Sequence, residues 1–103
     1  MVEDFITFKA LPDKVDAVKA LYRTYLAKLA DERAPIKRYA LYQSRFDDTE
    51  FVTYKAFATR ADEQVHHHMS DDLAAFVESL NELCEGGESH FREVELYVEY
   101  RSQ

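Results

Sequence analysis

One stretch, from Ala61 to Phe76, gathers more side chains able to do chemistry than any other part of the chain. It holds three of the four histidines, neighbouring acids and a serine that can begin a helix. Imidazole titrates near neutral pH, so a histidine in a pocket can take up or release a proton during a reaction. We therefore expect a reactive site, if the protein has one, to include this stretch.

The run from His66 to His68 does not predict a metal site. Successive side chains on a helix point about 100° apart, whereas the histidines of a zinc-binding helix are spaced i, i+4. Asp71 or Asp72 could add a ligand, but acids that follow Ser70 are better explained by the helix dipole, which favours negative charge at a helix start. We expect no metal ligands here.

Other catalytic signatures are missing from the sequence. It contains no Gly-rich phosphate loop, no Gly-x-Ser-x-Gly motif and no paired cysteines, so we expect neither a nucleotide cofactor nor a hydrolase triad. Cys84 falls on the apolar side of a predicted helix and is expected to be a buried hydrophobic residue. His90 lies at the start of a predicted strand and is expected to face solvent.

Composition restricts the class of protein. A chain of 103 residues predicts one domain spanning residues 1–103, and a net charge of −7 makes nucleic acid an unfavourable partner. The sequence has no apolar run of the length needed to cross a membrane, and residues 1–10 have no apolar core of a secretion signal. The single cysteine precludes an internal disulfide, so we expect a cytoplasmic protein.

Apolar periodicity predicts the elements that must position these residues. Alternation indicates strands, and apolar positions three and four residues apart indicate helices. Asp13 is placed to cap the first helix, and Gly86-Gly87 ends the last one. The predicted order is strand 2–9, helix 14–32, strand 36–46, strand 50–58, a short helical segment 61–69, helix 70–86 and strand 90–101.

This order predicts an α+β, ferredoxin-like βαββαβ fold, with a four-stranded antiparallel sheet and two helices on one face. The other face would carry half of every strand's side chains, too much apolar area to leave exposed on a monomer. We therefore expect a second copy of the chain to cover it, giving a homodimer. Side chains considered for that face are Phe5, Tyr39, Leu41, Phe51, Phe57 and Tyr97.

The element order and the pattern Ala61, His67, Ser70 and Phe76 resemble the antibiotic biosynthesis monooxygenase family of dimeric α+β barrels. The resemblance covers almost the whole chain. Two positions depart from the family pattern, since the second histidine of the family is Asp72 here and the usual acid near the end of the third strand is Lys55. The usual tryptophan or other aromatic residue falls at Phe57.

The resemblance implies a homodimer with a pocket in each subunit between sheet and helices. It also implies oxidation of a phenolic, quinol or polycyclic aromatic molecule by O2 without flavin, haem or metal. The protein would then deprotonate and orient the substrate and exclude water. On this alignment His67 is the predicted catalytic residue. A related branch degrades haem with the help of a tryptophan, and this chain has none.

The pocket would be lined by aromatic side chains, which can stack on a flat ring and hydrogen-bond to its oxygens. Strand phase predicts Tyr42 and Tyr54 on the helix side of the sheet. Arg38 and Lys55 could orient an anionic substrate, although solvated charges on a strand are the simpler interpretation. The predicted substrate-binding residues are Tyr42, Tyr54, Phe76, Asp72, Leu96 and Phe8.

An alternative function is kept open. Oxygenases, isomerases and binding proteins share this fold, so the fold alone does not fix a reaction. The chain could instead be a non-enzymatic member that binds a small aromatic molecule or a stress metabolite.

Overall fold

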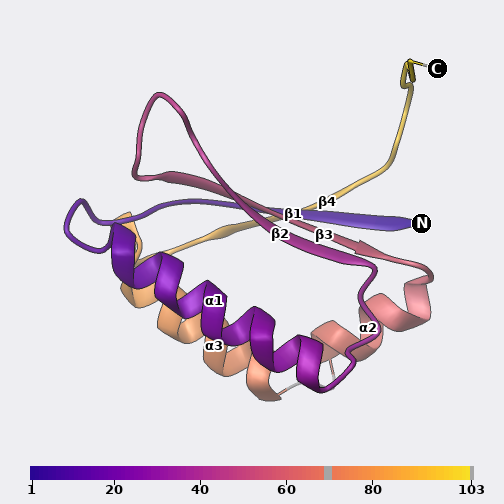
Figure 1. Ribbon diagram of the computed structural model, residues 1–103, viewed down its shortest axis with the longest axis horizontal. Helices are drawn as coiled ribbons and strands as arrows, with labels where there is room; N and C mark the ends of the chain where they lie inside the picture. Colours follow the sequence, from indigo (N-terminus) through magenta and orange to yellow (C-terminus); the bar gives the residue numbers. More distant parts are fainter. Residues whose placement is uncertain (69–70, 103) are drawn as a thin grey trace.

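The computed structural model describes residues 1–68 and 71–102 and contains one antiparallel sheet with helices on one of its faces (Figure 1). Within this part of the chain, no helix combines the length and apolar character that crossing a membrane requires. The elements are β1 (Val2–Lys9), α1 (Val15–Asp31), β2 (Arg38–Gln43), β3 (Glu50–Phe57), α2 (Arg60–His68), α3 (Asp71–Glu82), the 3-10 turn η1 (Glu85–Gly87) and β4 (His90–Val94).

The strand order confirms the ferredoxin-like prediction. The sheet runs β2-β3-β1-β4, with β1 and β3 in the centre and every neighbouring pair antiparallel. The helices α1 and α3 lie against each other below the sheet, and α2 lies at one end, below the end of β3 (Figure 1). The short helical segment expected before the last helix is α2. The serine expected to cap α3, Ser70, lies outside the described residues.

Alternate residues of the strands face the helices and form the core. On β1 these are Asp4, Ile6 and Phe8, all buried. Phe8 stacks on Phe51 of β3 and on Tyr22 of α1, with ring centroids 5.3 and 6.0 Å apart. Burying a side chain of this size stabilises the fold by roughly 1.5–3 kcal/mol. The core therefore holds α1 firmly against the centre of the sheet.

The end of the last helix and the start of the first both differ from the prediction, since α3 ends at Glu82 and Gly86 and Gly87 lie in the following 3-10 turn η1. Gly86 and Gly87 have φ of 73° and 69°, which glycine adopts without a steric penalty. The N-cap residue of α1 is Lys14 rather than Asp13, and no side chain caps it. Cys84 is buried, as expected, although it follows α3 rather than lying within it.

The predicted face of Tyr42 and Tyr54 is wrong. Tyr54 hydrogen-bonds to Glu3 and packs against Phe5, which alternates with the helix-facing residues of β1. Tyr42 interacts with Arg38 on the same open face. Alternation separates a strand into two rows but does not say which row is inside. Here both rows contain aromatic residues, and the buried row of β3 includes polar side chains.

Some of the residues considered for the open face belong instead to the row that faces the helices. Tyr39 packs against Tyr22 and Tyr25 of α1, so it faces the helices. Phe51 and Leu41 likewise join the helix-side core. Phe5 does lie on the open face. The open face is therefore less apolar than predicted, but it still carries aromatic rings.

The fourth strand is shorter than predicted. It ends at Val94, which pairs with Glu3, and β1 begins only one residue earlier. Residues beyond Val94 therefore have almost no main chain left to pair with, and residues 95–102 extend away from the sheet (Figure 1). Leu96 is 64% exposed in this tail. Its predicted position in a pocket between sheet and helices is therefore wrong.

Candidate active site

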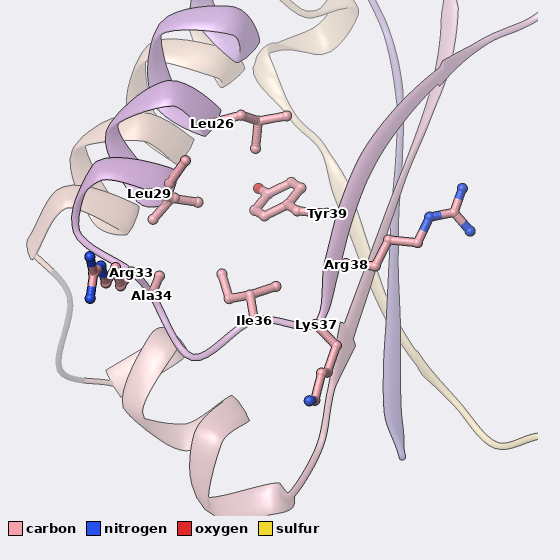
Figure 2. Close-up of a pocket in the computed structure, with 9 residues that line it drawn as sticks. Leu26, Leu29, Arg33, Ala34, Ile36, Lys37, Arg38 and Tyr39 are labelled. Atoms are coloured by element: carbon pink, nitrogen blue, oxygen red, sulfur yellow. The ribbon is translucent and has the colours of Figure 1, made fainter.

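A hollow opens where α1 ends and the chain turns into β2. One cavity of about 210 Å³ lies there, and the side chains of Leu26, Leu29, Ile36 and Tyr39 surround it (Figure 2). Arg38 points from β2 to the other side of the sheet. An adjoining cavity of about 460 Å³ shares three lining residues with the first. It is lined by Leu29, Glu32, Arg33, Ala34, Pro35, Val65, His66, Asp71 and Asp72.

The last turn of α1 shapes the edge of this hollow. Arg33 has φ of 52°, a left-handed conformation that side chains other than glycine rarely adopt. This conformation lets the Ala34 N–H donate to the Leu29 carbonyl at 3.1 Å, which closes the helix end. The chain then reverses toward β2. A strained helix end therefore sets the position of the cavity wall.

Three polar side chains from three elements meet beside the hollow. His66 comes from α2, Lys55 from β3 and Tyr39 from β2. The Lys55 Nζ lies 3.3 Å from the His66 Nε2 and 5.3 Å from the centre of the Tyr39 ring. The Lys55 side chain is 1% exposed and His66 is 4% exposed. We call these three residues the Lys55 group.

Burial sets the protonation of the Lys55 group. It lowers the pKa of Lys55 to about 8, although the Asp4 and Glu63 carboxyls act in the opposite direction. Burial, together with the Lys55 charge, lowers the pKa of His66 to about 3. Burial raises the pKa of Tyr39 far above its ordinary value. At neutral pH the group therefore holds an ammonium, a neutral imidazole and a phenol.

This combination can stabilise an anionic oxygen on a ligand. A buried ammonium and a phenolic O–H both donate hydrogen bonds, and charge-assisted hydrogen bonds are the stronger kind. The Tyr39 hydroxyl has no hydrogen-bond partner among the described residues. The lowered pKa of Lys55 also lets it exchange a proton near neutral pH. The group therefore suits a substrate that loses a proton on binding.

His67 lies beside the Lys55 group rather than on the cavity wall. Its Nε2 is 3.4 Å from the Asp4 Oδ2, and its ring packs against Phe57 and Phe91. Burial and the Lys55 charge lower the pKa of His67. The residue that lines the larger cavity is its neighbour His66. The catalytic role of His67 stays a prediction.

The predicted substrate-binding residues are divided among separate parts of the molecule. Asp72 lines the larger cavity and forms an ion pair with Lys28 at 2.9 Å. Phe76 is buried and stacks on Tyr25 at 4.1 Å, and it lines a third cavity with Asp72. Phe8 lies in the core. Asp72 and Phe76 come together at this cavity, whereas Tyr42 and Tyr54 lie beside Arg38 on the open face and Leu96 lies in the tail.

Sequence reasoning considered Lys55 for an anionic substrate but missed its grouping with His66 and Tyr39. The solvated position considered for Lys55 is wrong because its strand row, which begins at Phe51 and Thr53, faces the helices. The available signal was chemical, since Lys55 replaces the acid usual in the resembled family. His66 gave no periodic signal, because the buried positions of α2 are Glu63 and His66, both polar.

Comparisons with known proteins agree with this fold. The family model for antibiotic biosynthesis monooxygenases matches residues 1–79. A Nitrosomonas europaea protein with the same family name has a structure 22% identical, with a TM-score of 0.77, covering 95% of this chain and 100% of its own. A Mycobacterium tuberculosis protein is 22% identical, with a TM-score of 0.76 and coverage of 97% and 98%.

A third similar structure is a variant of SnoaB, a cofactor-independent oxygenase from Streptomyces nogalater. It is 12% identical, with a TM-score of 0.79, and the alignment covers 98% of this chain and 97% of that one. Comparison with curated proteins gives no match. At these identities the similar structures establish only the shared fold. The match to the family model establishes membership of the family.

Proposed function

We propose, from the premise that this chain belongs to the antibiotic biosynthesis monooxygenase family, that it oxygenates a small phenolic or quinol-like aromatic molecule with O2. The observation that supports this proposal is the Lys55 group beside the hollow between α1, α2 and the sheet. His66 lines the larger cavity and Tyr39 the smaller, more apolar one, and the buried Lys55 contacts both side chains. An aromatic ring with an acidic hydroxyl matches the apolar lining and the buried ammonium.

The chemistry begins when the neutral form of Lys55, which its pKa of about 8 makes accessible near neutral pH, takes the substrate's phenolic proton and becomes an ammonium. Lys55 and Tyr39 stabilise the phenolate oxygen, and the neutral His66 holds Lys55 in place. The electron-rich phenolate then reduces O2. One oxygen atom enters the substrate and the other leaves as water, with all electrons supplied by the substrate. The protein contributes deprotonation, orientation and exclusion of water.

The homodimer expected from the sequence belongs to the same proposal. The open face of the sheet carries Phe5, Tyr42 and Tyr54, and the tail after Val94 exposes further apolar side chains. A second copy covering this face would remove both from water. The cytoplasmic location expected from the single cysteine is also part of the proposal.

Oxygen uptake with a panel of polycyclic phenols and hydroquinones tests the function. Lys55→Met keeps the length of the side chain and removes its charge, so we expect turnover to fall by about 10²- to 10³-fold. His68→Ala changes an exposed neighbour on α2 and is expected to keep full turnover. A Lys55→Met protein as active as the parent would contradict the role of Lys55.

Two further results complete this test. His67→Ala, compared with His66→Gln, decides which histidine affects turnover. We expect His66→Gln to be the slower variant, because His66 contacts Lys55 and lines the cavity. If the parent binds phenols in calorimetry but consumes no O2 with any of them, the chain is a binding protein and the oxygenase proposal fails.

A further inference from the structure

A second set of buried ionisable side chains lies within reach of the Lys55 charge. Asp4 enters from β1, and Glu63 and His67 come from α2, one helical turn apart. The spacing i, i+4 places Glu63 and His67 on the same side of the helix. One ligand atom from each of the three residues lies within 4.8 Å of the other two. We call these three residues the Asp4 cluster.

The two carboxylates of the Asp4 cluster are buried, His67 is half-buried, and four polar atoms of the cluster have no hydrogen-bond partner among the described residues. Asp4 is 0% exposed and Glu63 is 3% exposed. Neither oxygen of Asp4 has a partner within the described part of the chain, and the same holds for the Glu63 Oε2 and the His67 Nε2. The other Glu63 oxygen accepts a hydrogen bond from Arg60 at 2.8 Å. The unpartnered atoms therefore face one another. Buried carboxylate oxygens without hydrogen bonds are costly, and buried charges in proteins are ordinarily paired or bound to a metal ion.

The donor set has the chemistry of a transition-metal site. Imidazole and carboxylate are both ligands of Zn²⁺, at about 2.0–2.2 Å from the ion. In a tetrahedral site this places neighbouring ligand atoms roughly 3.4 Å apart. The His67 Nε2 and the Asp4 Oδ2 are already 3.4 Å apart, and a ligand atom of Glu63 lies within 4.8 Å of both residues' ligand atoms. We propose that Asp4, Glu63 and His67 bind one divalent transition-metal ion, with Zn²⁺ as the best-fitting example.

This proposal revises the sequence-based expectation of no metal ligands. That expectation considered three consecutive histidines, which cannot converge on an ion, and only His67 of the three is used here. The second ligand, Glu63, has the i, i+4 spacing that the run lacks. The third, Asp4, is distant in sequence and reaches the site because β1 pairs with β3, the strand that α2 contacts. Three ligands leave one position open for water.

A proton competes with the metal ion for the carboxyls of Asp4 and Glu63. Burial and the adjacent Glu63 carboxyl raise the pKa of Asp4. Burial also opposes ionisation of Glu63, but its contacts with Asp4 and the Arg60 guanidinium lower its pKa overall. Without metal, the two carboxyls therefore share one proton. Zn²⁺ would displace this proton, and the Lys55 charge nearby would oppose the ion. Zn²⁺ carries no redox chemistry, so the electrons of the proposed oxygenation do not pass through it.

Calorimetric titration of ZnCl₂ into chelator-treated protein tests the proposal. We expect one ion per chain and a higher Tm in its presence. Glu63→Gln keeps the shape of the side chain and removes a ligand. We expect it to weaken binding by more than about 100-fold, because even groups that only orient a ligand commonly contribute 10- to 100-fold. Asp4→Asn should have the same effect.

The controls separate this site from adventitious binding. His68→Ala, which alters the histidine run but not the Asp4 cluster, should bind Zn²⁺ as the parent does. In chelator, Asp4→Asn should be at least as stable as the parent, since it removes an unpaired buried carboxyl. Absence of Zn²⁺ binding by the parent would overturn the proposal. So would equal binding by Glu63→Gln, or loss of binding in His68→Ala. These outcomes are independent of any turnover measurement.

Discussion

At the scale of single residues, Lys55 is the most informative position in the molecule. A lysine on a strand is ordinarily solvated, yet this one is buried among His66, Tyr39 and the Asp4 cluster. Its type was visible in the sequence, but its environment was not. The environment depends on which row of β3 faces the helices, and on side chains from three other elements.

The lowered pKa of Lys55 predicts how stability changes with pH. Its pKa is 10.5 in the unfolded chain and about 8 in the fold, so between these values the unfolded chain holds more protons. Stability should therefore rise with pH across this window, by up to about 3 kcal/mol. Above about pH 10 the tyrosines with raised pKa values act in the opposite direction.

Urea unfolding of the parent and Lys55→Met between about pH 8 and 10 measures this effect. The parent should gain stability over this range, and Lys55→Met should lack the gain. Lys9→Met alters an exposed strand lysine and should behave as the parent. If the stability of the parent and of Lys55→Met changed with pH in parallel, burial would not lower the pKa of Lys55.

At the scale of elements, the sequence predicted the order and type of strands and helices but not the row of each strand that faces inward. Hydrophobic alternation is a reliable guide only when one row is clearly polar. On β3 the helix-facing row includes Thr53 and Lys55, while the open row includes Val52 and Tyr54. The hydroxyl of Tyr22, 2.7 Å from the Thr53 hydroxyl, satisfies the polar atom inside. Such long-range pairs are invisible to local pattern.

The left-handed residue at the end of α1 gives a prediction at the same scale. Arg33 adopts φ of 52°, which costs a residue with a Cβ roughly 1–2 kcal/mol relative to glycine. Arg33→Gly should therefore be about 1 kcal/mol more stable than Arg33→Ala, since both remove the guanidinium and only glycine relieves the backbone. Urea unfolding midpoints of the two variants provide the comparison. Equal midpoints would contradict strain at this position.

At the scale of the whole molecule, the ferredoxin-like fold and the family were predictable, because element order and spacing persist in the sequence. The end of β4 was not. Alternation continues to Arg101, but a strand requires a partner, and β1 offers none beyond Val2. The alternating residues beyond Val94 therefore have no partner strand within a single subunit.

The exposed tail predicts its own role in assembly. Tyr97, Val98 and Tyr100 are largely exposed, and together with Leu96 they give residues 95–102 an apolar surface with no cover in the subunit. We expect the full chain to be a dimer by light scattering. A chain ending at Val94 should have a dimer dissociation constant at least about tenfold higher than that of the full chain. A chain ending at Arg101 should dimerise as tightly as the full chain. Equal dimerisation of all three chains would exclude the tail from the interface.

Isotopic labelling of the product tests the proposed oxygenation most directly. The parent is incubated under ¹⁸O2 with a phenol that supports oxygen uptake, and mass spectrometry of the product counts the labelled atoms. We expect one ¹⁸O atom per product molecule, and a yield that falls with Lys55→Met. A product with its new oxygen drawn from water, or a labelled yield that Lys55→Met leaves unchanged, would contradict this proposal.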